Sequence, residues 1–313
     1  KIEVPMENKK SNHTPMANDA KKEFVVNYHM NEFCNYSCEY CYAKWGIGDL
    51  KKEIHNDLDK VEILLNSLYG FFSKNHESVR LNLVGGEPSL TKNFKAIIKI
   101  AHRIGFKIGL VTNGSVIDED FIVNYSKYLS VIGFSIDAVS KEVMKKIGRA
   151  TSSGRTLNID LLAKKITQLR LHSPGIKIKI NTVVNKNNFS HNLRSLLYKA
   201  SPDKWKVFRV LPNVNPDSKI TDDQYSTFLE NHREFSHIMF PEDNNVMVGS
   251  YVMVDPLGRF FDNTCFDSQD AGYIYSSQIT EVGAEEAFKV INFDQEKFWM
   301  RYDNENLIGK MAS

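Results

Sequence analysis

The chain contains 313 residues, of which 42% are hydrophobic and 25% are charged, as in ordinary soluble globular proteins. This composition excludes disorder as the main state, and a net charge of +2 provides no field for binding a nucleic-acid polymer. No apolar run approaches the length of a membrane span, and four cysteines are too few for a disulfide scaffold.

The first 22 residues are polar and lack periodic apolar positions, which predicts a flexible tail. They contain neither the apolar core of a signal peptide nor the pattern of an amphipathic membrane helix. We therefore expect a cytoplasmic protein that has no membrane contact and keeps its cysteines reduced.

Strand and helix signals alternate without a linker from residue 23 to residue 212. Short apolar runs predict strands at 24–30, 79–84, 107–112, 131–136, 176–184 and 204–211. Apolar residues at helical spacing predict helices at 58–72, 94–104, 118–128, 157–171 and 193–199. This alternation indicates parallel βα units. Because six units are fewer than the eight of a closed TIM barrel, we predict an α/β fold with an open, partial (β/α)6 barrel. A flat, doubly wound sheet is the alternative.

Residues 213–313 follow a different pattern. One amphipathic helix is expected at 222–235, and a hairpin is expected around the turn sequence DPLG at 255–258. Two further helices are expected at 282–291 and 294–302. We interpret this part as a C-terminal extension, or lid, that closes the active site.

Three of the four cysteines, Cys34, Cys38 and Cys41, follow the first predicted strand with the spacing C-x3-C-x2-C. Their mostly polar neighbours disfavour buried, apolar cysteines. A zinc site usually takes four ligands, and no nearby Cys or His pair completes one. The short loop favours an iron–sulfur cluster bound by three thiolates, with one iron left open to a substrate or cofactor. Cys265 stands alone, so no auxiliary cluster is expected.

The cysteine motif, with the aromatic Tyr40 before its last cysteine, resembles the signature of radical S-adenosylmethionine (SAM) enzymes. The sequence GGEP at 85–88 is similar to a second motif of that superfamily. The resemblance implies a partial (β/α)6 barrel, with a [4Fe–4S] cluster and SAM as cofactors. It also implies SAM-binding positions at Tyr40, Gly85, Gly86, Glu87, Asn113 and Ser135.

Longer stretches resemble the viperin family in the same order, among them LNLVGGEPSL, VTNGSVI and KINTVVNKNN. The similarity extends from about residue 26 to residue 299. It implies a nucleotide dehydratase, a lyase-type ddhNTP synthase that converts CTP, UTP or GTP to its 3′-deoxy-3′,4′-didehydro form. In that family a 5′-deoxyadenosyl radical abstracts the 4′ hydrogen of the substrate, and the product is an antiviral chain terminator.

The resemblance further implies a cationic site for the substrate. Triphosphate contacts fall on Arg80, Arg149, Lys179, Asn181 and Lys206, and a further substrate contact falls on Asn27. The strand at 176–184 supports this independently, because Lys177, Lys179 and Asn181 share one face and isoleucines share the other. A buried parallel strand is normally apolar on both faces, so the polar face favours a polar cavity over an exposed edge.

The expected partners are a nucleoside triphosphate and an external one-electron reductant that is flavodoxin- or ferredoxin-like. We expect a monomer. Two other functions stay open from the sequence: a radical SAM enzyme that modifies a peptide or nucleobase, and a non-catalytic interaction protein with an iron–sulfur or zinc site. The single downstream cysteine disfavours the first, and the joint presence of cofactor and phosphate positions disfavours the second.

Overall fold

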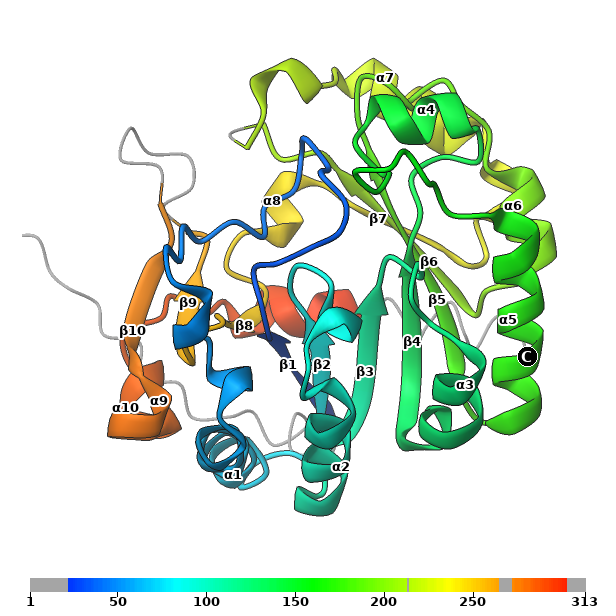
Figure 1. The fold of residues 1–313 in the computed structure, drawn as a ribbon. Helices are drawn as coiled ribbons and strands as arrows, with labels where there is room; N and C mark the ends of the chain where they lie inside the picture. Colours follow the sequence, from blue (N-terminus) through cyan, green and yellow to red (C-terminus); the bar gives the residue numbers. More distant parts are fainter. Residues whose placement is uncertain (1–21, 213, 265–271, 303–313) are drawn as a thin grey trace, which may run out of the picture.

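The computed structural model describes residues 22–212, 214–264 and 272–302. Ten strands form one sheet in the order β10-β9-β8-β1-β2-β3-β4-β5-β6-β7 (Figure 1). The first six strands are β1 (Glu23–His29), β2 (Ser78–Val84), β3 (Lys107–Thr112), β4 (Leu129–Ser135), β5 (Lys177–Val184) and β6 (Lys204–Arg209). They pair in parallel and in chain order, as the alternation of strands and helices predicts.

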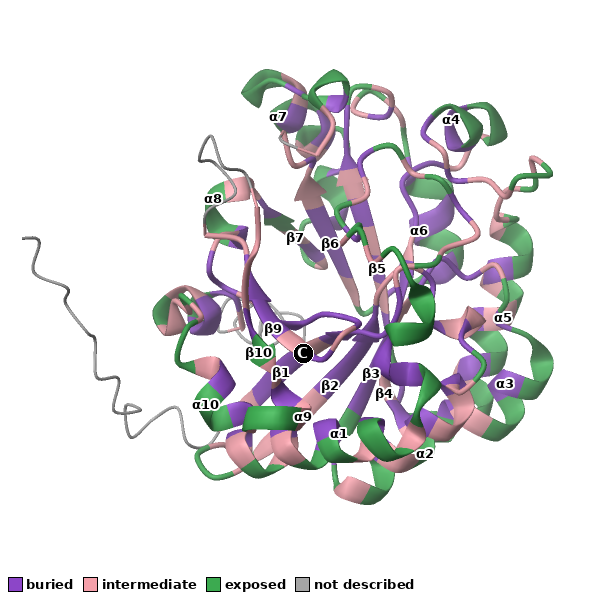
Figure 2. Ribbon diagram, turned by 60° about the vertical axis from the view of Figure 1, so that its left-hand side comes forward, coloured by how far each residue is buried: buried purple, intermediate pink, exposed green. Residues whose placement is uncertain are grey.

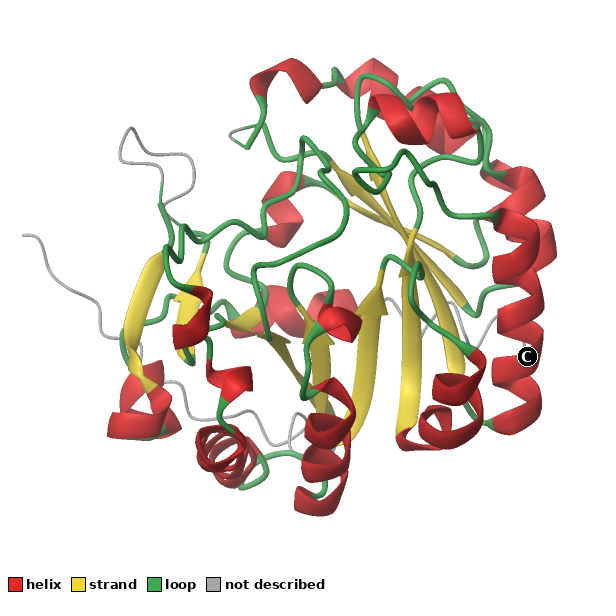
Figure 3. Ribbon diagram, viewed as in Figure 1, coloured by secondary structure: helices red, strands yellow, loops and turns green. Residues whose placement is uncertain are grey.

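Helices cover the outer face of this curved sheet (Figure 3). They are α1 (Leu58–Phe72), α2 (Phe94–Ile104), α3 (Glu119–Tyr125), α5 (Ile159–His172) and α6 (Arg194–Ala200). A doubly wound sheet reverses its strand order and carries helices on both faces. Here the order from β1 to β6 never reverses, so the partial-barrel prediction is confirmed and the doubly wound alternative is wrong.

Local sequence explains where the outer helices begin. The Asp57 carboxylate caps α1 by accepting hydrogen bonds from the backbone N–H groups of Asp59 at 3.1 Å and Lys60 at 3.2 Å. Asn158 caps α5 in the same way, through the N–H of Leu161 at 3.0 Å. Each helix buries a row of apolar residues against the sheet, including Val61, Leu64 and Leu68 of α1 and Leu162, Ile166 and Leu169 of α5.

The C-terminal segment adds strands to both sides of the barrel sheet. β7 (Met239–Glu242) pairs in parallel with β6, whereas β8 (Val252–Val254) returns to pair in parallel with β1. β9 (Arg259–Asp262) and β10 (Ile274–Gln278) follow in antiparallel pairing, which confirms the predicted hairpin as β8–β9. β7 was not predicted because it is short and contains Pro241, which is tolerated on the edge strand of a sheet.

Five shorter helices complete the fold: α4 (Lys141–Lys146), α7 (Asp222–Glu230), α8 (Asn244–Met247), α9 (Ile279–Val282) and α10 (Ala284–Phe288). Gly283, at φ +81°, separates α9 from α10 where one helix is predicted at 282–291. Residues 295–302 are helical, close to the prediction. The predicted tail, apart from Lys22, and Cys265 lie outside the described residues.

The strands of the barrel sheet are largely buried (Figure 2), but their two faces carry different side chains. On β5, Ile178 and Ile180 are buried in the hydrophobic core, whereas Lys179 and Asn181 face the inside of the barrel. β5 lies between β4 and β6, so it is not an exposed edge strand. Over the described ranges, no helix combines the length and apolar character needed to cross a membrane.

Candidate active site

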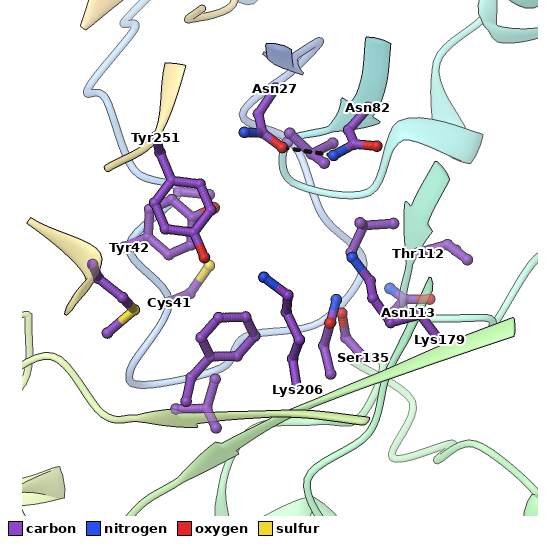
Figure 4. A pocket seen from close by; sticks show the side chains of 18 of the residues that line it. Asn27, Cys41, Tyr42, Asn82, Thr112, Asn113, Ser135, Lys179, Lys206 and Tyr251 are labelled. Carbon is purple, nitrogen blue, oxygen red and sulfur yellow. Dashed lines mark hydrogen bonds between the residues drawn. The ribbon is translucent and has the colours of Figure 1, made fainter. Parts of the chain in front are cut away.

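The inside of the partial barrel forms a cavity of about 630 Å³ (Figure 4). Fourteen of the predicted site residues line it: Cys34, Cys38, Cys41, Tyr40, Gly85, Gly86, Asn113, Ser135, Asn27, Arg80, Arg149, Lys179, Asn181 and Lys206. The polar face of the strand predicted at 176–184 also lines this cavity. Glu87 is the one predicted site residue that does not.

The cysteine loop (residues 30–49) brings three free, partly exposed thiols to the cavity. A tight turn joins the last two cysteines, because Cys41 N donates a hydrogen bond to Cys38 O at 3.2 Å. The backbone N–H of Tyr36 donates to Cys34 Sγ at 3.4 Å, which stabilises negative charge on that sulfur.

These thiols have the donor chemistry of an iron–sulfur cluster. Within the described residues, no three Cys, His, Asp or Glu side chains converge as ligands of one ion. A [4Fe–4S] cluster takes one thiolate per iron, so its cysteines stand further apart. Burial raises the pKa of the Cys34 thiol and raises that of Cys38 to about 11. A cationic iron centre would supply the charge that both thiolates need.

The Gly85–Gly86 pair packs directly against the start of the cysteine loop. Gly86 N donates a hydrogen bond to Asn31 O at 2.7 Å. A Cβ on Gly86 would stand 2.1 Å from Phe33 O, and a Cβ on Gly85, at φ +142°, would stand 2.7 Å from Asn31 O. Glycine is required at both positions because the two backbones touch.

Glu87 joins the ends of two neighbouring strands. Its carboxylate is fully buried and accepts hydrogen bonds from Thr112 Oγ1 at 2.8 Å and Asn113 N at 2.7 Å. Burial raises the pKa of Glu87, and these donors oppose the rise. The carboxylate therefore ties the end of β2 to the end of β3, and the predicted contact of Glu87 with SAM stays a prediction.

Two polar side chains hold the cysteine loop from the ends of β3 and β4. Asn113 Nδ2 donates to Asn35 Oδ1 at 2.8 Å and lies 3.8 Å from Cys34 Sγ. The Tyr40 hydroxyl donates to the carboxylate of Asp137, which is only 1% exposed. Asp137 is absent from the predicted site, although an acidic residue directly after a buried strand was a signal that could have revealed it.

Arg149 lies beside the cysteine loop. One of its guanidinium nitrogens is 2.9 Å from Asp137 Oδ2 and 3.7 Å from Cys38 Sγ. Another donates to the carbonyl oxygen of Ser135. Asp137 neutralises this buried charge. Arg149 therefore lies with the residues around the cysteines at the wall of the cavity, and its predicted contact with the triphosphate stays a prediction.

A separate group of cations comes from the strands and the C-terminal segment. Burial, with the charges of Lys206 and Arg80, lowers the pKa of Lys179 to about 7. Lys204 and Arg301 belong to the same group, although neither is a predicted site residue. Burial and the charges of Lys206 and Lys179 lower the pKa of Lys204 to about 4. The lowered pKa values mean that these amines resist protonation when they lie together, and a bound polyanion would stabilise their ammonium forms.

Glu242, at the end of β7, is the buried counter-charge of this group. Its carboxylate binds Lys206 Nζ and the Tyr251 hydroxyl, and Arg301 Nε lies 3.8 Å away. Burial raises the pKa of Glu242, but the charges of Lys206 and Arg301 outweigh burial and hold it at about 2. The carboxylate is therefore ionised, and it orients Lys206 within the cavity.

Two glycines inside strands make room for polar side chains within the barrel. A Cβ on Gly109 of β3 would stand 2.1 Å from Asn82 Oδ1, and a Cβ on Gly133 of β4 would stand 2.9 Å from Lys179 Cε. Asn82 in turn donates to Asn27 Oδ1 at 2.9 Å (Figure 4). Glycine within a strand marks such close approaches, so this pair was a further signal in the sequence.

The chain matches the model of the Radical SAM superfamily over residues 28–182. A relative from Psychrobacter lutiphocae, named S-adenosylmethionine-dependent nucleotide dehydratase, is 40% identical over 304 residues, which cover 95% of this chain and 99% of the relative. A relative of the same name from Pseudoalteromonas ulvae is 35% identical over 295 residues, which cover 91% and 95%.

Among solved structures, native anSMEcpe with bound AdoMet superimposes with a TM-score of 0.63 at 15% identity, covering 87% of this chain and 81% of that one. At this identity the likeness concerns the fold alone, and it agrees with the partial barrel. The relatives confirm the resemblance found in the sequence. The chain belongs to the S-adenosylmethionine-dependent nucleotide dehydratases of the radical SAM superfamily.

Proposed function

We propose that this chain dehydrates the ribose of CTP, UTP or GTP to the 3′-deoxy-3′,4′-didehydro form. The observation that carries the proposal is a single cavity with two separate groups of residues. One group is a loop of three cysteines with the donor set of a [4Fe–4S] cluster. The other is a set of buried cations suited to a triphosphate. Relatives over nearly the whole chain bear the name of nucleotide dehydratases.

In this proposal Cys34, Cys38 and Cys41 hold the cluster. A reduced cluster bound there would supply the electron for the cleavage of SAM, and the cofactor's own radical chemistry would act on the 4′ hydrogen. Arg149, beside Cys38, carries a positive charge suited to the carboxylate of SAM. Ser135, Tyr40 and the backbone of the glycine pair line the space for the rest of the cofactor.

Lys179, Lys206 and Arg80 bind the triphosphate in this proposal, with Asn181 beside them on β5. No hydrogen bond or ion pair engages Lys179 within the described residues, so its ammonium group is available to phosphate. Lys206 is held in place by Glu242. Binding the phosphates in this way positions the ribose against the cofactor. Such positioning accounts for much of an enzyme's rate enhancement.

The product has no 3′ hydroxyl, so a polymerase that incorporates it has no group to extend. This chemistry suits an antiviral chain terminator. We further propose that the protein works in the cytoplasm as a monomer and takes its electrons from an external flavodoxin- or ferredoxin-like carrier.

Nucleotide binding should weaken as the pH rises above 7. In the nucleotide-free protein Lys179 has a pKa of about 7, so it loses its proton over this range. A bound triphosphate stabilises the ammonium form, so binding takes up a proton and the Kd should rise by up to about tenfold per pH unit between pH 7 and 9. Calorimetry in buffers of different ionisation enthalpy measures this uptake. If the Lys179→Met variant took up as many protons on binding as the wild type, the assignment of Lys179 to the triphosphate would be contradicted.

The function is tested by reconstituting the cluster anaerobically, reducing it with dithionite and adding SAM. The formation of 5′-deoxyadenosine is then measured with CTP, UTP, GTP or ATP in turn. We expect at least one of the first three to stimulate it and to be converted to the dehydrated product, while Cys38→Ala stays inactive. If no triphosphate stimulates 5′-deoxyadenosine formation, the proposed function is wrong. Zinc-loaded, iron-free protein would support a non-catalytic role.

A further inference from the structure

A basic surface lies on the segment that connects β4 to α5. We define the basic ridge as four exposed side chains of this segment: Lys141, Lys145, Lys146 and Arg155. The ammonium group of Lys145 lies 4.0 Å from where a Cβ on Gly154 would stand, so α4 and the following turn form one surface. The acidic side chain of α4 is Glu142, so positive charge predominates on the ridge.

The basic ridge is built directly onto the cysteine loop. Ser37 N donates a hydrogen bond to Gly148 O at 3.0 Å, and Cys38 Sγ lies 3.8 Å from the same oxygen. A Cβ on Gly148, at φ +78°, would stand 2.1 Å from Ser37 O, so no side chain separates the two segments. A molecule seated on the ridge is therefore close to a proposed cluster ligand.

The outer side of the cysteine loop adds apolar contact area. Phe33 precedes Cys34 and is 54% exposed, whereas Tyr42, after Cys41, lines the cavity. Ser37, beside Cys38, is also exposed. Exposed aromatic side chains next to charged ones are typical of surfaces that bind another protein, where the aromatics bury area and the charges guide the encounter.

We propose that the basic ridge and the exposed Phe33 of the cysteine loop dock an acidic electron-carrier protein. This inference rests on the proposed function, because only a redox centre at the cysteines requires an electron. One electron leaves the reduced carrier, which is oxidised by one unit, and the cluster held by the three thiolates is reduced by one unit. The sign of the ridge selects a negatively charged carrier, since attraction between opposite charges accelerates association.

The test compares two double charge reversals, with reduced flavodoxin as the carrier. K145E/K146E reverses the ridge, and K127E/K164E makes the same charge change on exposed lysines of the outer helices. Flavodoxin binding is measured by biolayer interferometry with cluster-free and cluster-loaded protein, and cluster reduction is followed by stopped-flow absorbance. At low salt the ridge variant should bind flavodoxin about tenfold more weakly than the wild type. Its cluster should be reduced by flavodoxin about tenfold more slowly. The control variant should match the wild type.

The salt dependence and dithionite separate this inference from the proposed function. Raising the salt should bring the wild-type rate down towards that of the ridge variant. With dithionite, both variants should form 5′-deoxyadenosine at the wild-type rate. Equal flavodoxin binding and reduction by the wild type and K145E/K146E, or an equal loss in the control, would overturn the docking surface. Failure of every triphosphate with dithionite would instead overturn the proposed function, while ridge-dependent flavodoxin binding would survive it.

Discussion

Replacing Gly86 with alanine should abolish cluster binding and with it all activity. The new methyl group would stand 2.1 Å from Phe33 O and 2.5 Å from Glu32 O, and neither backbone oxygen can rotate away. The start of the cysteine loop must then shift, which changes the spacing of the three thiols. Such overpacking costs about 1–3 kcal/mol or more. Iron content and the visible absorbance of the reconstituted protein measure the loss.

Gly48→Ala is the matched control, because Gly48 lies in the same loop and nothing stands within 4 Å of its added methyl group. This variant should load iron like the wild type. A Gly86→Ala protein with normal iron content and normal 5′-deoxyadenosine formation would contradict the view that backbone contact between the two loops sets the positions of the thiols.

Replacing Lys206 with alanine should weaken nucleotide binding by about 30- to 5,000-fold while leaving the cluster spectrum intact. The substitution removes one cation from the triphosphate site and leaves Glu242, which is 3% exposed, without its strongest partner. Truncating one partner of a buried charge pair costs about 2–5 kcal/mol. Calorimetry with the preferred triphosphate measures the affinity, and the absorbance of the reconstituted protein reports on the cluster.

The double variant K206A/E242Q separates the effect of losing the phosphate contact of Lys206 from the effect of leaving the Glu242 carboxylate unpaired. Removing the charge of Glu242 should restore most of the thermal stability lost in Lys206→Ala, because no unpaired carboxylate is then buried. It should not restore nucleotide affinity, because the phosphates still lack their ammonium partner. Loss of the cluster in Lys206→Ala, or wild-type affinity in the double variant, would contradict the assignment of Lys206 to the triphosphate.

The sequence predicts the barrel well because its signals are local and repeated. The helix over Leu58–Phe72 and the strand over Lys107–Thr112 have the bounds expected from apolar spacing alone. The misses are short or interrupted elements. β7 has four residues and a proline, α4 has six residues, and Gly283 divides a predicted helix. None of these elements is long enough to show the apolar periodicity by which a helix or strand is predicted.

The residues that line the cavity were predictable where a sequence motif or the alternation of a strand places them inside the barrel, as for Lys179 on β5. Site residues were not predictable where tertiary contacts decide. The carboxylate of Glu87 accepts hydrogen bonds from donors at the end of β3, and Arg149 pairs with Asp137 beside the cysteine loop. Neither contact follows from the local sequence. Glu242 lies on β7, the edge strand beside β6, and this strand is too short for a local sequence pattern to indicate the role of Glu242.

The central claim is that one cavity places the ribose of a bound triphosphate against the cofactor at the cysteines. The most direct measurement is mass spectrometry of the 5′-deoxyadenosine formed with a triphosphate deuterated at C4′. The account predicts that one deuterium atom is transferred to 5′-deoxyadenosine in each turnover, and that the nucleotide product lacks it. Formation of 5′-deoxyadenosine without deuterium, alongside unchanged nucleotide, would contradict the account.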